Sequence, residues 1–410
     1  MTQMILPSTP YIYIIGVGQR LGRLWLWAVL WSLSATLHGQ SLALLDTIAR
    51  NNPTLRAAQA GRQAAEAANR TDTRLPDPEA EVAYLVGSPK GVPGRTNVSL
   101  TQSLDWGVLT KRRQLLAEAA DRTAASQYRE TRRVVLGEAL QQLVLLIHAN
   151  RTLAELDSRL SLACQVEQLC QKKLEQGALT ELELNKARLN VAMAKADRQR
   201  ACDERETVLA RLRTLNGGQP LHCADTLYSL PARELCLAGT TPTAVRPAAV
   251  EGAEAAVSQA QAELKLARTR QWATFSVGFQ GEYIRQNNYS GLSLGLSLPL
   301  WGNGRAEVRR RKAELLATQL NLADIQQQAG ASQLQLSQTT RRLLQVADEL
   351  QQGLLATQNT QLLQRALQAG QISLLDYLLE CSFYYSARTA WLEAERDAYL
   401  AAAELYAFGL

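Results

Sequence analysis

The stretch Leu292-Ser293-Leu294-Gly295-Leu296-Ser297-Leu298 alternates leucine with small residues at every position. Successive side chains of a β-strand point to opposite faces, so this pattern predicts a strand with one strongly apolar face. Segments 79–86, 97–104 and 274–283 alternate in a similar way. The polar segments 87–95 and 285–290 are predicted to be loops, so the chain is expected to contain two strand pairs.

Two-faced strands of this kind suit a soluble sandwich or a membrane barrel, whose strands have one face toward lipid and one toward a wet lumen. The tryptophans favour the barrel, because Trp106, Trp272 and Trp301 each adjoin a strand end and indole rings prefer the headgroup region of a membrane. We predict these three residues to be membrane-interface aromatics. The residues expected to face lipid are Val98, Leu100, Phe279, Leu294 and Leu296, and those expected to face the lumen are Ser99, Thr101 and Ser297.

Four strands in one chain are too few to close a barrel. Closed barrels begin at about eight strands, and an open sheet edge in lipid leaves backbone groups without partners, at several kcal/mol each. The strand count therefore predicts an assembly, with twelve strands from three chains or eight strands from two chains.

The sequence is a tandem duplication with a period close to 194 residues. Pro53 opens a helical segment and so does Pro247, Trp106-Gly107 recurs as Trp301-Gly302, and Gly177 recurs as Gly370, at offsets of 194, 195 and 193. Repeats at a fixed period indicate a repeated structural unit. We expect a first repeat over 40–218, an irregular linker over 219–246 and a second repeat over 247–410. Each repeat contains a helix, two strands and a long helical hairpin.

The helices are predicted to be very long. Residues 108–176 contain no proline and 69 residues in all, which corresponds to about 100 Å of continuous helix at 1.5 Å per residue. A coiled-coil seam at three/four spacing is expected at Leu153, Leu156, Leu160, Ala163, Val166 and Cys170, and the returning helix offers small residues for close approach at Ala187, Ala192, Ala194, Ala196 and Ala201. A plain coiled-coil rod would account for these helices but not for the strands.

Residues 1–39 have the order of a secretory signal peptide. Arg20 and Arg23 precede an apolar run over 24–33, and small residues follow it. The alternative is an N-terminal membrane anchor, although a run of ten residues is short for a bilayer span of about 20. No later stretch has 18 consecutive apolar residues, so no membrane helix is expected after residue 39.

Composition argues against several functional classes. The net charge is only +6, and no basic stripe with stacking aromatics suggests nucleic-acid binding. Six cysteines form no CxxC pair and only three histidines are present, so neither a metal site nor a cofactor is predicted. Cys223 and Cys236 could form a disulfide or remain free thiols, and His148 is interpreted as a packed helix residue. No motif of an enzyme is recognised.

The chain has one signal followed by two copies of a strand pair with a long helical hairpin. This order resembles the TolC-like outer-membrane efflux proteins. The segment Leu75-Pro76-Asp77-Pro78-Glu79, followed by a strand, a Gly-Ser-Pro loop and a second strand, is similar to the metal-efflux branch of that family. The turns at 177–184 and 370–377 resemble the family's periplasmic tips, with Glu183 where an aspartate is usual. The resemblance covers essentially the whole chain after residue 39.

This resemblance implies a homotrimer in the outer membrane, with a twelve-stranded barrel continuous with a periplasmic helical tunnel. It implies the exit duct of a tripartite efflux pump for toxic small molecules or metal cations, docked to a periplasmic adaptor and an inner-membrane pump, commonly proton-driven. The residues expected at the periplasmic tip or gate are Gly177, Leu179, Thr180, Glu183, Gly370, Ile372, Ser373 and Asp376. The two acids could equally be helix N-terminal charges. The other functional classes considered are a periplasmic coiled-coil adaptor and a stand-alone diffusion porin.

Overall fold

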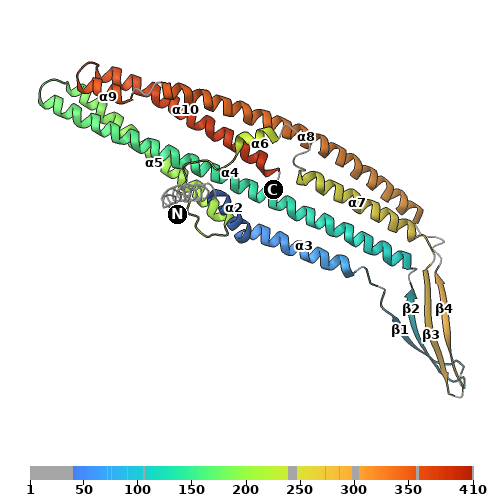
Figure 1. The fold of residues 1–410 in the computed structure, drawn as a ribbon. Helices are drawn as coiled ribbons and strands as arrows, with labels where there is room; N and C mark the ends of the chain where they lie inside the picture. Colours follow the sequence, from blue (N-terminus) through green and yellow to red (C-terminus); the bar gives the residue numbers. More distant parts are fainter. Residues whose placement is uncertain are drawn as a thin grey trace, which may run out of the picture.

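The protein is described by a computed structural model over residues 40–71, 73–74, 76–89, 91–104, 107–238, 247–272, 274–285, 287–297, 304–356 and 360–408. It is an elongated molecule with a long helical part at one end and a four-stranded sheet at the other (Figure 1). The predicted signal peptide, Trp106, Trp301 and Leu298 lie outside the described residues.

The elements follow the order expected of two repeats. The first repeat contains α2 (Gln40–Asn51), α3 (Pro53–Thr71), β1 (Glu79–Leu85), β2 (Arg95–Leu104), α4 (Gly107–Glu175) and α5 (Glu181–Leu215). A short helix, α6 (Ala232–Ala238), lies between the repeats. The second repeat contains α7 (Ala248–Thr269), β3 (Thr274–Ile284), β4 (Asn288–Ser297), α8 (Gly304–Ala356), α9 (Thr360–Gln368) and α10 (Leu374–Ala407).

Helix α4 is 69 residues long, and the other helices of the first repeat pack against it. Helices α3 and α5 follow one another along it, with the start of α3 next to the end of α5 (Figure 1). The junction is held by Asn52, whose side-chain amide donates to the carbonyl of Leu215 at 2.8 Å and whose side-chain oxygen accepts from the N–H of Leu55 at 3.0 Å. Two shorter helices thus cover one long helix, and α7 and α10 pack along α8 in the second repeat.

The largest core lies midway along the helical part, where α2, α4, α5, α10 and the segment after α5 meet. Leu143, Leu146, Leu212 and Ile48 are at most 1% exposed there. The predicted irregular linker is wrong in part, because residues 232–238 form a helix. Pro231 suits that helix start, since its fixed φ is helical and its carbonyl accepts from the N–H of Leu235.

The predicted α4 seam is buried in its second half, at Ala163, Val166 and Cys170, while Leu153, Leu156 and Leu160 are only half-buried. On α5 the prediction is partly wrong, because Ala192 and Ala196 are exposed. The buried positions of α5 are spaced by three or four from Leu184, and Ala192 lies five residues after Ala187, off that stripe. The buried residues of α5 include Leu184, Ala187, Val191 and Ala201.

The four strands form one antiparallel sheet in the order β1-β2-β3-β4. Strands β2 and β4 begin earlier than the alternation predicted, at Arg95 and Asn288. Both extensions pair with β3, as Arg95 opposes Ile284 and Asn288 opposes Tyr283. Backbone hydrogen bonds do not require apolar side chains, so the ladder continues into residues that hydropathy assigned to loops.

The structure also describes Cys223 and His148, two residues whose roles the sequence left open or only interpreted. Cys223 is a buried free thiol, while the side chain of Cys236 lies outside the described part of the chain. His148 is half-buried in α4, and its Nε2 lies 3.5 Å from the hydroxyl of Thr152. No helix in the described part of the chain has both the length and the apolar character needed to cross a membrane.

Candidate functional site

The sheet has two chemically different faces, and the strand register decides which residues share each face. Leu100 lies opposite Phe279, which lies opposite Leu292, and Val277 lies opposite Leu294. Side chains on one face repeat every second residue along each strand. The five residues predicted to face lipid therefore share one face, and Ser99, Thr101 and Ser297 share the other.

The apolar face is exposed in the single chain. Leu292 and Leu294 are 85% and 83% exposed, and Val82 is 71% exposed. The remaining exposed large side chains on this face are Tyr84, Leu100, Leu104, Phe275, Val277, Phe279, Tyr283 and Leu296. An exposed apolar surface of this extent marks a site that binds protein or lipid.

The opposite face carries short polar and charged groups. Arg95 and Glu282 pair across β2 and β3 at 2.9 Å, and Ser99 lies opposite Gln280. Glycines lie on this face too: a Cβ at Gly278 would sit 2.7 Å from the carbonyl oxygen of Leu100. This face is suited to water, and its small residues keep the space above it open.

Within the described chain, β1 and β4 pair on one side only. Each therefore leaves one row of backbone N–H and C=O groups without strand partners. The only described member of the predicted interface aromatics, Trp272, is 72% exposed between α7 and β3.

The opposite end of the molecule contains the two helical turns. Gly177 and Gly370 have φ of +69° and +72°, a left-handed conformation that glycine adopts readily. After α4, the N–H of Gly177 donates to Leu174 and that of Ala178 donates to Lys173, at 2.9 Å each. The same two-bond pattern follows α9 at Gly370. Both repeats thus end their helices with the same glycine motif.

Thr180 and Ser373 cap the helices that follow these turns, and each lies three residues before one of the two tip acids. Glu183 and Asp376 are the third residues of α5 and α10, so both lie in the first turn of their helix. The hydroxyl of Thr180 donates to Glu183 at 2.7 Å, and that of Ser373 donates to Asp376 at 2.6 Å. Hydrogen bonds from the backbone N–H of Thr180, and then from its hydroxyl, lower the pKa of Glu183.

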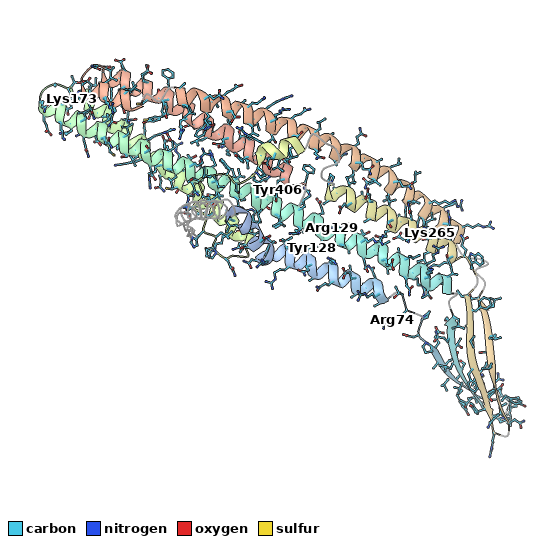
Figure 2. The ribbon with its side chains drawn as sticks, in the orientation of Figure 1. Arg74, Tyr128, Arg129, Lys173, Lys265 and Tyr406 are labelled. Atoms are coloured by element: carbon cyan, nitrogen blue, oxygen red, sulfur yellow. The ribbon has the colours of Figure 1, made fainter. Side chains whose placement is uncertain are left out.

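The apolar tip residues lock the two turns together. Leu179 and Ile372 each precede a capping residue, and each packs on a shared cluster. That cluster contains Leu184 and Tyr377, the fourth residues of α5 and α10, each 2% exposed. This is the hydrophobic staple of a helix N-terminus, used once in each repeat. Lys173 adds a polar link, because its ammonium donates to the carbonyl of Leu367 in α9 at 3.0 Å (Figure 2 labels Lys173).

A ladder of arginines, acids and aromatic rings joins α4 to α10, and sequence reasoning missed it. Arg151 pairs with Glu395 at 2.7 Å, and its guanidinium lies 4.9 Å from the ring centroid of Trp391. Glu155 pairs with Arg159 at 3.1 Å and with Arg388 at 3.3 Å. The available signal was the spacing of four residues between 151, 155 and 159. The ladder fastens the second repeat to the first.

Solved structures of outer-membrane channels match nearly the whole chain. CusC, described for conformational changes accompanying folding and transmembrane channel formation, aligns with a TM-score of 0.74 at 17% identity, covering 90% of this chain and 92% of that chain. The CmeC outer membrane channel of Campylobacter jejuni aligns at 0.71 and 17%, covering 90% and 85%. The open MtrE outer membrane channel of Neisseria gonorrhoeae aligns at 0.70 and 19%, covering 90% and 89%. No protein-family model and no curated protein sequence matches the chain.

The chain has the fold of the TolC-family outer-membrane channels. In this mainly helical chain, each repeat contributes two strands to one four-stranded antiparallel sheet. The resemblance predicted from the sequence is confirmed at the level of the fold, and CusC is among the structures that share it.

Proposed function

We propose that this protein is the outer-membrane channel of a tripartite efflux pump, the duct through which solutes pass from the periplasm to the exterior. The observation that carries this proposal is the sheet with one exposed apolar face and one polar face, joined to a 69-residue helix. A sheet of this kind suits a barrel wall between lipid and water. The likeness in fold to known outer-membrane channels supports the same role.

The unpaired edges of β1 and β4 favour a trimer. An edge cannot remain open in lipid, because its backbone groups have no water to bond. Pairing β4 of one chain with β1 of the next closes a ring, and three chains supply twelve strands. Four helices pack side by side in the order α8-α10-α4-α5. The threefold rotation that closes the strands into a barrel would also join these helices of three chains into a closed tube. We therefore propose a homotrimer in the outer membrane, with the helices in the periplasm.

The other partners are proposed from the resemblance. A periplasmic adaptor and an inner-membrane pump, proton-driven, would deliver the cargo to the helical end. Metal cations and toxic small molecules are the proposed cargo classes, and the segment 75–79 favours the metal-efflux branch.

Four measurements test the channel. A closed barrel predicts that the protein fractionates with outer membranes and changes its gel mobility on heating, and that the detergent-solubilised complex has the mass of three chains. A mass of two or four chains would contradict the trimer. A deletion strain is expected to become sensitive to toxic metals or drugs, and the pattern of sensitivities identifies the cargo.

The same measurements separate the alternatives. A periplasmic coiled-coil adaptor would fractionate without a heat-modifiable band. A stand-alone porin would conduct in planar bilayers, but its deletion would leave efflux intact. The exposed apolar sheet disfavours the adaptor, and the length of α4 disfavours the porin.

The tip supports a narrower proposal, that Glu183 and Asp376 line the periplasmic mouth as six carboxylates in a trimer. Crowded like charges attract cations and resist complete closure. The gate proposal predicts altered cation selectivity and pH sensitivity for Glu183→Gln and Asp376→Asn, largest in the double variant. Single-channel recordings in planar bilayers test it, and unchanged conductance and selectivity in all three variants would leave these acids only their role as helix N-terminal charges.

A further inference from the structure

Basic side chains gather where the helices meet the strands. We call this region the basic collar and define it by residues 70–77, 107–113, 265–271 and 304–312, which adjoin the sheet in sequence. It contains thirteen basic residues and three acidic ones, Asp72, Asp77 and Glu307. The basic residues are Arg70, Arg74, Lys111, Arg112, Arg113, Lys265, Arg268, Arg270, Arg305, Arg309, Arg310, Arg311 and Lys312.

The net positive charge of the collar is larger than that of the whole chain. Its net charge is +10, while the full chain is +6, so the remainder of the molecule is net negative. The collar lies on both repeats at the same end of the molecule, with Arg74 after α3 and Lys265 near the end of α7 (Figure 2). Helical periodicity alone does not produce this segregation, because the same helices carry mixed charge along the rest of their length.

Most of these cations are not neutralised within the chain. Arg310 and Arg311 pair with Glu307 and Glu314. Ten others have no ion pair with any residue that the structure describes: Arg70, Arg74, Lys111, Arg112, Lys265, Arg268, Arg270, Arg305, Arg309 and Lys312. Nine of these ten are exposed, Arg112 being the exception. The collar is therefore open to an anionic partner.

A cavity at the collar is lined by both cationic and apolar side chains. It measures about 540 Å³ and lies between the end of α3, the start of α4 and the end of α7. Arg74, Arg113 and Arg270 supply its positive charge, while Leu116 and Leu266 supply apolar surface. Asp77 also lines it, so its net charge is smaller than three arginines alone would give. Cations beside an apolar wall match the phosphate of a lipid, which also carries acyl chains, better than they match a free soluble anion.

We propose that the basic collar binds the phosphates of anionic phospholipids in the inner leaflet of the outer membrane, and that this cavity holds one such headgroup. The inference rests on the proposed function, because it requires the sheet to span the membrane. The collar then lies at the level of the periplasmic headgroups, where Trp272 also prefers to lie. Each Lys or Arg near an anionic membrane surface is attracted to it by about 1 kcal/mol. The collar would therefore hold the protein at one fixed depth in the membrane.

The test is native mass spectrometry of the full-length, detergent-solubilised protein with added lipid. The wild type is expected to retain phosphatidylglycerol in preference to phosphatidylcholine. Arg74→Gln/Arg113→Gln/Arg270→Gln is expected to weaken phosphatidylglycerol retention by roughly a hundredfold, since each lost cation costs about fivefold. The exposed single variant Arg74→Gln, whose fold is least at risk, is expected to show about fivefold.

A matched control removes the same charge at the opposite end, as Lys172→Gln/Lys186→Gln/Arg365→Gln, and should retain the lipid as the wild type does. Equal losses in the control and the collar variant would overturn the proposal, as would equal retention of the two lipids by the wild type. Displacement of the lipid by millimolar inorganic phosphate would reassign the cavity to free anions and overturn the lipid assignment. Heat-modifiable mobility is recorded in parallel: its absence in the wild type would refute the channel itself, whereas its presence with failed lipid retention refutes only the collar.

Discussion

The helical part and the sheet are stabilised in different ways. The helices bury several clusters of their own, while no buried hydrophobic side chain lies in the four described strands. The sheet instead exposes its largest apolar groups, such as Leu292 and Leu294. A surface of this kind is unfavourable in water, since each buried Leu contributes about 1.5–3 kcal/mol. The comparison teaches that the helices cover their apolar side chains within one chain, whereas the sheet leaves its apolar face uncovered within the described chain, for the lipid and neighbouring chains of the proposed channel to cover.

The largest expected effect is in the helical core. Leu143→Ala should cost about 2–5 kcal/mol, because Leu143 is 1% exposed and its truncation leaves a cavity. Helix melting followed by circular dichroism measures this loss. The control is Leu292→Ala at an 85% exposed position, which should leave helix melting within about 0.5 kcal/mol of wild type. Equal shifts would mean that the two parts do not differ in the way described.

The sheet should respond to substitution according to its face. Leu294→Arg should cost about 2–4 kcal/mol of barrel stability near the membrane midplane. Ser293→Arg places the same charge at the same depth on the polar face and should be far milder. The heat-modifiable fraction in outer membranes measures both. Helix melting of the unassembled chain should not change with either variant, and equal assembly defects would show that the faces are assigned wrongly.

The helical part should lose stability in mild acid through His148. Burial, together with the nearby Arg396 and Arg151, lowers the pKa of His148 to about 4, and Asp397 opposes this only in part. The unfolded chain, with a His pKa near 6.5, then binds more protons between these values, so stability falls as pH drops from 6.5 to 4. The loss amounts to at most about 3 kcal/mol. His148→Gln should flatten this dependence in melts at pH 7 and pH 5, and an unchanged pH dependence would refute the assignment.

The smallest expected effects are at the helical tip. Thr180→Ala and Ser373→Ala should each cost about 1 kcal/mol, because each hydroxyl caps a helix N-terminus. Hydrogen exchange at the start of α5 and α10 measures these losses locally. Thr180→Ser and Ser373→Thr retain the hydroxyl and should restore protection. A loss of barrel assembly on removal of either cap would show that the tip and the sheet are coupled, contrary to the comparison.

Much of the fold follows from local pattern. The alternation at 292–298 predicts a two-faced strand, and the proline-free run of 108–176 predicts one long helix that the structure places at Gly107–Glu175. The repeated glycines predict turns because only glycine adopts the left-handed backbone easily. The strand starts at Arg95 and Asn288 and the helix at 232–238 were not predictable in this way, because pairing and packing with distant residues stabilise them.

The candidate sites divide along the same line. The glycine turns and the two faces of each strand follow from the sequence alone, since each depends on residues near one another in the chain, whereas the gathering of basic residues beside the strands was not predicted. The contacts of Arg151 with Glu395 and Trp391, and the cavity shared by Arg74, Arg113 and Arg270, became known from the three-dimensional packing alone. The physical reason is that helical and strand periodicity fix the face on which a side chain lies, whereas its partner depends on how helices far apart in the sequence pack against one another.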